Sequence, residues 1–207
     1  MTDNIDKYNK GNATVKNGAD DQKSDKTDNL ENNIEDNERK MVDVIIPTYR
    51  PAKEFGELLH RLEKQEYRPN RILVMNTGKE YWNSEWENYP LLEVHHLDQK
   101  DFDHGGTRKR AAELSTADIM VFMTQDALPA DRKMIGNLVR AVSRNSGTGA
   151  AYARQLPNAD CRFLERYTRS FNYPEQSSVK SLSDVETYGI KTYFCSNVCA
   201  AYDREIY

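Results

Sequence analysis

The segment Val121–Asp131, VFMTQDALPAD, leads from a buried strand to a single carboxylate and then towards a helix. The run Ile119–Phe122 is wholly apolar, which is typical of a short strand covered on both faces of a sheet. Thr124, Gln125 and Asp126 follow this run almost at once. Apolar residues at helical spacing come after the segment, with Asp131 near the expected cap. The pattern predicts a strand that ends at Asp126.

The preceding chain repeats this alternation of strand and helix. The predicted elements are a strand at 42–46 stopped by Pro47, a helix at 52–65, a strand from 71 ending in the turn 76–78, a strand at 91–98, and the loop 105–108 feeding a helix with Thr107 as its N-cap. Strand and helix thus alternate four times along the chain. This alternation predicts an α/β domain around a mainly parallel, Rossmann-like sheet flanked by helices.

The later part of the chain predicts a strand near residue 150, a helix near 163–171 and a return strand within 191–207. Aromatic residues are dense here, and we expect core packing rather than sugar stacking for most of them. They are Phe163, Tyr167, Phe171, Tyr173, Tyr193, Phe194 and Tyr202.

Composition limits the classes of protein. Residues 1–40 are rich in Asn, Asp and Lys, so we expect a disordered polar tail before a domain at 41–207. The formal net charge of -4 gives no sign of the excess of basic residues that is typical of nucleic-acid-binding proteins. The sequence contains neither an apolar run that would span a bilayer nor a secretory signal. Cys161, Cys195 and Cys199 predict buried free thiols rather than a disulfide framework or a zinc site.

Ligands of open α/β sheets bind at the carboxyl ends of the strands. The polar residues at these predicted ends are Thr48, Tyr49 and Arg50, then Asn76 and Thr77, then Asp103–Arg108, and finally Thr124, Gln125 and Asp126. We expect them to converge on one cleft.

Two other nucleotide enzymes are disfavoured by the order of motifs. A dinucleotide enzyme would need a G-x-G-x-x-G turn after the first strand, where the chain has PTYRPAKEFG. A sugar-nucleotide pyrophosphorylase carries a glycine-rich phosphate loop at that same place. The GGTR segment here begins only at Gly105.

Four segments, VDVIIPTYRP, RILVMNTG, FDHGGTRKRAAELSTADIMVFMTQDALPAD and YFCSNVCAAYDREIY, occur in an order that resembles family 2 glycosyltransferases. The similarity extends over residues 42–207 and is closest to the bacterial rhamnosyltransferase branch. It implies a GT-A fold, a nucleotide-diphosphate sugar donor, a divalent cation (Mg²⁺ or Mn²⁺) and inversion at the anomeric carbon. The implied enzyme is a metal-dependent hexosyltransferase that makes surface polysaccharide.

The resemblance also implies which residues bind the nucleotide sugar. They are Pro47, Thr48, Tyr49, Arg50, Asn76, His104, Gly105, Gly106, Arg108, Thr124, Gln125 and Asp126. Asp126 is the implied metal ligand, since hard cations prefer oxygen. The family usually has Asp-x-Asp here, whereas this chain has Thr124 at the first position. Asn76 stands where the family often has an aspartate that accepts the pyrimidine N3–H.

The resemblance places the general base beyond Tyr207, so we expect a domain truncated at its C-terminal end and assign no catalytic residue. Asp160, Glu165 and Asp203 are weak candidates for that base. A non-catalytic sugar-nucleotide-binding domain, or an inactive fragment, is the alternative.

The expected donor is deoxythymidine-diphosphate-rhamnose, and the acceptor is a glycan or lipid-linked sugar. Arg154, Gln155 and Asn197 are candidates for contact with the acceptor. The expected location is cytoplasmic, at the inner face of the membrane if the protein associates with it.

Overall fold

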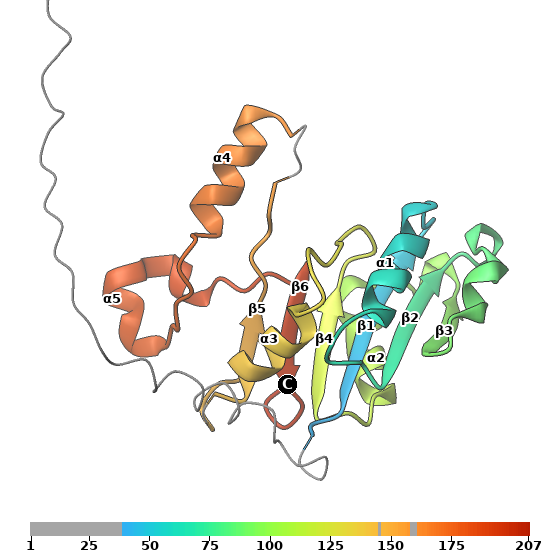
Figure 1. Cartoon of the computed structure of the whole chain (residues 1–207), viewed down its shortest axis with the longest axis horizontal. Coiled ribbons are helices and arrows are strands. Elements are labelled where there is room, and N and C mark those ends of the chain that lie inside the picture. The colour runs from blue at the N-terminus through green and yellow to red at the C-terminus, as the bar shows by residue number, and fades with distance from the viewer. Residues whose placement is uncertain (1–38, 145, 158–160) are drawn as a thin grey trace, which may run out of the picture. The chain divides into compact units, whose positions relative to one another are not determined.

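The computed structural model describes residues 39–144, 146–157 and 161–207. The expected disordered tail lies outside this part, apart from its last two residues. Lys40–Tyr207 forms one unit, in which six strands make a single sheet in the order β3-β2-β1-β4-β6-β5 (Figure 1).

The strands are β1 (Val42–Tyr49), β2 (Arg71–Thr77), β3 (Leu92–Leu97), β4 (Ile119–Met123), β5 (Ala150–Tyr152) and β6 (Cys199–Asp203). The α-helices are α1 (Glu54–Glu63), α2 (His104–Leu114), α3 (Met134–Val142), α4 (Phe163–Asn172) and α5 (Val185–Tyr188). Short 3-10 turns occupy Lys79–Tyr81, Ser84–Asn88, Gln99–Asp101, Leu182–Asp184 and Gly189–Tyr193. β1 to β4 pair in parallel, while β6 runs antiparallel to both β4 and β5. The predicted mainly parallel α/β sheet is confirmed.

Alternate residues of the strands pack against helices on opposite faces of the sheet. Val44 and Ile46 of β1 pack in the cluster that holds the buried residues of α1 and α3. Ile45 packs in the other cluster, with Ala111 and Ala112 of α2. Figure 1 shows α1 and α3 on one side of the sheet and α2 behind it. Because both faces are covered, the central strands read as continuous apolar runs.

β1 is longer than the sequence predicts. Pro47 lies inside the strand opposite Met75 of β2, and the strand continues to Tyr49. Pairing of β1 with β4 ends at Ile45 and Phe122, so only one neighbour remains alongside Pro47. A residue without an N–H is tolerated where one side of a strand has no partner. The predicted stop at Pro47 was therefore wrong, and the extension carries Thr48 and Tyr49 to the edge of the sheet.

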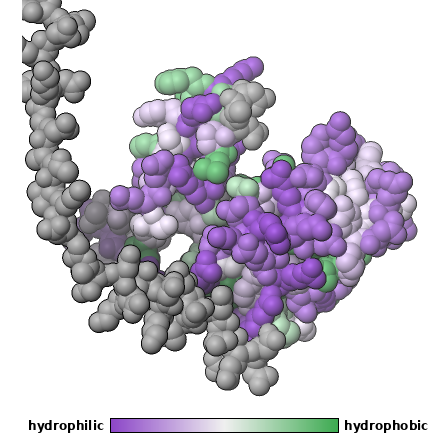
Figure 2. Space-filling model, in the orientation of Figure 1, coloured by the Kyte–Doolittle hydropathy of each residue, from purple (hydrophilic) through white to green (hydrophobic). Residues whose placement is uncertain are grey.

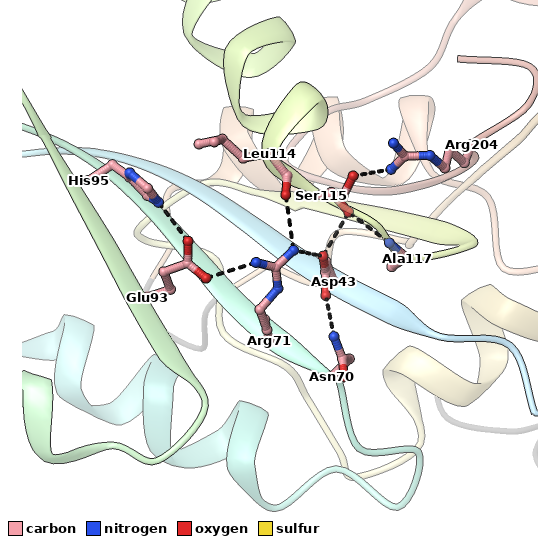
Figure 3. A network of polar contacts seen from close by, with 9 residues as sticks. All are labelled: Asp43, Asn70, Arg71, Glu93, His95, Leu114, Ser115, Ala117 and Arg204. Carbon is pink, nitrogen blue, oxygen red and sulfur yellow. Dashed lines mark hydrogen bonds and ion pairs between the residues drawn. The ribbon is translucent and has the colours of Figure 1, made fainter.

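A buried carboxylate joins the strands at their amino ends (Figure 3). Asp43 is fully buried and accepts hydrogen bonds from Asn70 (3.2 Å), Arg71 (2.9 Å) and Ser115 (2.7 Å). Arg71 also pairs with Glu93 at 2.8 Å and donates to the carbonyl of Leu114 at the end of α2. This network ties β1, β2, β3 and α2 together at the edge opposite the predicted ligand site.

The segment between β5 and β6 differs most from the expectation of core packing. Tyr173 is buried, but Phe163, Tyr167, Phe171 and Tyr193 are each more than half exposed. Figure 2 shows hydrophobic surface in the region where Figure 1 places α4. The polar side of α4 faces a cavity, which leaves its aromatic side outward.

The cysteines are free thiols, as expected. Only Cys199, on β6, is buried, and Cys195 is exposed, so the prediction of three buried thiols was wrong.

Candidate nucleotide-sugar site

The ends of β1 and β2 are joined by two buried side chains. The Thr48 hydroxyl donates to Asn76 Oδ1 at 3.0 Å, and both residues are at most 2% exposed. The Asn76 amide also donates to the carbonyl of Gly78 and lies 3.0 Å from Nδ1 of His96. These two predicted base-binding residues therefore lie beneath the surface and hold the strand ends together.

Tyr49 ends β1 and is 39% exposed. Its backbone N–H donates to Oε1 of Gln125 at 2.8 Å, and its carbonyl accepts from Nε2 of Gln125 at 3.1 Å. Gln125 thus bonds both polar backbone atoms of Tyr49 from the turn after β4. The structure therefore brings the end of β1, which is predicted to bind the base, into direct contact with the turn after β4, which bears the predicted metal ligand.

Arg50 follows with a backbone φ of 47°, a left-handed conformation that is uncommon for a residue other than glycine. Its guanidinium donates to the Tyr81 hydroxyl at 2.8 Å. The guanidinium carbon lies 4.4 Å from the centroid of the Tyr81 ring and 5.1 Å from that of Tyr49. Tyr81 was not predicted, because it lies in a short turn with no pattern of its own.

The segment predicted as a loop before α2 is the first turn of that helix. Asp103, not Thr107, is the N-cap, and its carboxylate accepts from the backbone N–H of Gly106. A Cβ added at Gly106 would lie 3.0 Å from Oδ2 of Asp103, so glycine lets the cap close. His104, Gly105 and Gly106 are exposed. They occupy a helix N-terminus, where backbone N–H groups favour an anion.

Arg108 turns back along α2 and donates from Nη1 to the carbonyl of His104 at 2.9 Å. Its Nε is buried without a hydrogen-bond partner within the described part of the chain, and so is Oγ1 of Thr124. Both residues line a cavity of about 870 Å³. Arg108, which is predicted to bind phosphate, and Thr124 at the end of β4 therefore border the same cavity.

Asp126 lies on the turn after β4, where the N–H of Ala127 donates to the carbonyl of Thr124 at 3.2 Å. It is exposed, and its carboxylate makes no hydrogen bond or ion pair with other described residues. The described ranges hold no group of three or more His, Cys, Asp or Glu residues that could bind a metal ion. The protein would thus supply one carboxylate here. A cation that takes its other oxygen ligands from a diphosphate and water fits this site.

The cavity continues from Thr124 and Arg108 towards α4. Its lining includes Gln155, Arg162, Leu164, Glu165, Thr168, Arg169, Asn172, Tyr173, Phe194, Ser196 and Asn197. Gln155 donates to Ser196 at 3.0 Å and accepts from Arg169 at 2.9 Å. Two of the predicted acceptor residues, Gln155 and Asn197, line this cavity. The third, Arg154, forms an ion pair with Glu175 at 3.5 Å instead.

The three candidates for the general base are separated by the structure. Glu165 lines the cavity, where its carboxylate pairs with Arg169 at 2.9 Å. Asp203 pairs with Lys40 and lies opposite Ile119, at the start of β4 and the other edge of the sheet. Asp160 lies outside the described residues.

His95 and His96 read as positions of the third strand, and the sequence predicts no site role for either. In the structure, His96 lies beside the Asn76 amide. His96 is itself exposed, and partial desolvation of its ring, followed by the charge of Lys79, lowers its pKa. It lines a smaller cavity of about 270 Å³ with Gly78, Lys79, Glu80, Leu97, Asp98 and Gln99. His95, which was expected to have no role in the site, pairs with Glu93 in the network at the other edge.

Comparison with known proteins relates this chain to proteins that transfer sugars. The model of the glycosyl transferase family 2 matches residues 43–207. The O-antigen chain rhamnosyltransferase RfbN of Salmonella typhimurium is 39% identical over 173 residues, which cover 80% of this chain and 53% of that protein. The O-antigen chain rhamnosyltransferase WbaN of Salmonella anatum is 30% identical over 166 residues, covering 79% of this chain and 52% of that protein. The chain spans about half the length of these two relatives.

Among solved structures, the mannosyltransferase PcManGT of Pyrobaculum calidifontis, in complex with GDP-Man and Mn²⁺, superposes with a TM-score of 0.57. The two chains are 21% identical, and the match covers 81% of this chain and 45% of that one. At this identity the likeness concerns the fold, which agrees with the predicted GT-A type.

Proposed function

This chain belongs to glycosyl transferase family 2, and we propose that it transfers a sugar from a nucleotide-diphosphate donor to a glycan or lipid-linked acceptor. The favoured sugar is rhamnose, and the reaction would serve surface polysaccharide synthesis. The observation that carries this proposal is the contact between Gln125 and Tyr49. It sets the exposed tyrosine at the end of β1 beside the turn that bears Asp126. One donor can therefore reach both with its base and its diphosphate.

The base of the donor would lie against Tyr49 and Arg50. An exposed tyrosine ring and a guanidinium both offer a flat surface on which a pyrimidine stacks. Thr48 and Asn76 would act from beneath, because their burial leaves them no direct reach to the base. Pro47 belongs to the strand that presents this turn.

The diphosphate would lie between the turn after β4 and the start of α2. His104, Gly105 and Gly106 present the positive end of a helix dipole, and Arg108 adds a fixed positive charge. Asp126 would hold a divalent cation, with Thr124 beside it. When bound, Mg²⁺ or Mn²⁺ would neutralise the charge that develops on the leaving diphosphate.

The acceptor would occupy the cavity of about 870 Å³. Three arginines, Arg108, Arg162 and Arg169, and one carboxylate, Glu165, are its charged lining residues, and Tyr173 and Phe194 add aromatic surface. A hydroxylated ligand would meet both hydrogen-bond donors and rings on which a sugar can stack.

A non-catalytic sugar-nucleotide-binding domain is the second candidate function. It is favoured by one observation: Glu165, the carboxylate that lines the cavity, is already tied to Arg169. A general base must be free to take a proton from the acceptor hydroxyl. Measuring donor hydrolysis and sugar transfer beside nucleotide binding separates the two functions. A non-catalytic domain would bind the nucleotide but would neither hydrolyse the donor nor transfer the sugar.

We place the protein in the cytoplasm, with α4 as its contact with the inner face of the membrane. The exposed aromatic side of α4 comprises Phe163, Tyr167 and Phe171. Arg166 lies on the same helix, so this surface combines apolar groups with a basic one, which favours an anionic lipid interface. No described helix is long and apolar enough to cross a bilayer.

The donor is tested by titration calorimetry of this chain with deoxythymidine and uridine diphosphates, each with and without Mg²⁺ or Mn²⁺. We expect a modest preference for the deoxythymidine nucleotide and binding that requires the cation. A site that bonds the ribose 2′-hydroxyl would instead disfavour the deoxy nucleotide, since buried polar groups would be left unpaired. A clear preference for uridine diphosphate would contradict the assignment to a rhamnose donor.

A further inference from the structure

Gln125 extends the pairing of β1 and β4 beyond the point where their backbones separate. The parallel ladder ends at Ile45 and Phe122, four residues before Tyr49. The Gln125 carboxamide then takes over, accepting from the Tyr49 N–H and donating to the Tyr49 carbonyl. An amide side chain carries a carbonyl oxygen that accepts and N–H groups that donate, the same kinds of group as a backbone peptide. It therefore replaces a strand residue as the partner of Tyr49.

The two bonds constrain the direction in which the Tyr49 side chain leaves the backbone. The N–H of Tyr49 belongs to the peptide plane before its Cα atom, and its carbonyl belongs to the plane after it. Holding both planes fixes the two backbone dihedral angles of this residue and thereby the direction of its Cα–Cβ bond. The second plane also leads into Arg50, whose φ of 47° needs support from its surroundings.

We propose that Gln125 is a positioning residue for donor binding: it holds Tyr49 in place rather than contacting the donor itself. This inference rests on the proposed function and revises the direct contact expected for Gln125 from the sequence. Both polar groups of its side chain already bond Tyr49. Gln125 directly precedes Asp126, so it also holds the end of β1 beside the turn after β4 that bears this carboxylate.

A double-mutant cycle tests this role. Gln125→Ala, Tyr49→Ala and the double variant are titrated with deoxythymidine diphosphate in the presence of Mg²⁺. Gln125→Ala should weaken binding roughly tenfold, the effect of about one net hydrogen bond. In the Tyr49→Ala background the same change should cost less than about threefold, because the side chain that Gln125 positions is gone. Equal losses in both backgrounds, or no loss in Gln125→Ala, would overturn the proposal.

Gln125→Glu is the matched control, since it keeps the length of the side chain and the bond to the Tyr49 N–H. Its carboxylate cannot donate to the Tyr49 carbonyl and repels it, so this variant should bind no better than Gln125→Ala. Binding equal to that of the parent would contradict the role of the paired bonds.

Amide hydrogen exchange gives a readout that does not depend on any ligand. Removing Gln125 should speed exchange in the peptide that contains Tyr49 and leave the centre of β4 protected. Unchanged exchange at Tyr49 would overturn the positioning role. If exchange rises while even the parent chain binds no nucleotide, then the proposed donor site has failed and the structural action of Gln125 stands.

Discussion

Replacing Asp43 by alanine should destabilise the fold strongly without touching the ligand edge of the sheet. Asp43 is fully buried and accepts from Asn70, Arg71 and Ser115. A hydrogen bond to a charged partner contributes about 1.5–3 kcal/mol and a typical one about 0.5–1.5 kcal/mol. Arg71 keeps Glu93 as a partner and its side chain is 27% exposed, so it is not left as an isolated buried charge. We therefore expect a loss of about 3 kcal/mol, below the upper range for a broken buried pair.

For a unit of this size, that loss corresponds to a fall in Tm of roughly 6–12 °C. Thermal unfolding followed by circular dichroism measures it. Glu93→Gln is the control, because it removes the more exposed partner of the same arginine and should cost under about 1 kcal/mol. If Asp43→Ala melts within the error of Glu93→Gln, then the buried network does not hold the strands as described.

Three further predictions concern other parts of the chain. Deleting residues 1–38 should leave Tm nearly unchanged, because so polar a segment buries little apolar surface; a fall of many degrees would refute this. The pKa of Glu93 is lowered from 4.5, first by the bond to His95 and then by Arg71, so its stabilisation should be present above that value and lost on acidification. Urea unfolding from about pH 6 to about pH 3 should show a smaller loss for Glu93→Gln than for the parent. Phe163→Ser with Tyr167→Ser should reduce sedimentation with phosphatidylglycerol vesicles at least about tenfold, whereas Leu114→Ser should not; equal sedimentation of both variants would contradict lipid docking.

The parallel core and the convergence of strand ends could be predicted because both depend on local pattern. Continuous apolar runs mark strands covered on both faces, and the carboxyl ends of parallel strands meet at one edge. The start of α2 could not be read correctly, since GG is typical of a loop. The cap at Asp103 lets the helix include both glycines.

The individual tasks of the site residues depend on contacts between distant segments. Nothing in the sequence indicates that Asn76 is buried against Thr48 or that Gln125 bonds the backbone of Tyr49. The outward aromatic side of α4 was also missed. Its helical spacing resembles that of a core helix, and only the position of the cavity decides which side faces inward.

The most direct test of the donor site is metal-dependent binding of deoxythymidine diphosphate to the parent chain and to Asp126→Asn, measured by calorimetry. The substitution keeps the shape of an exposed side chain, so the fold should survive, and it removes the charge proposed to hold the cation. We predict that Mg²⁺ strengthens binding to the parent at least about tenfold and strengthens binding to the variant far less. Equal enhancement of both proteins by Mg²⁺ would contradict the account, because the cation would then be bound elsewhere.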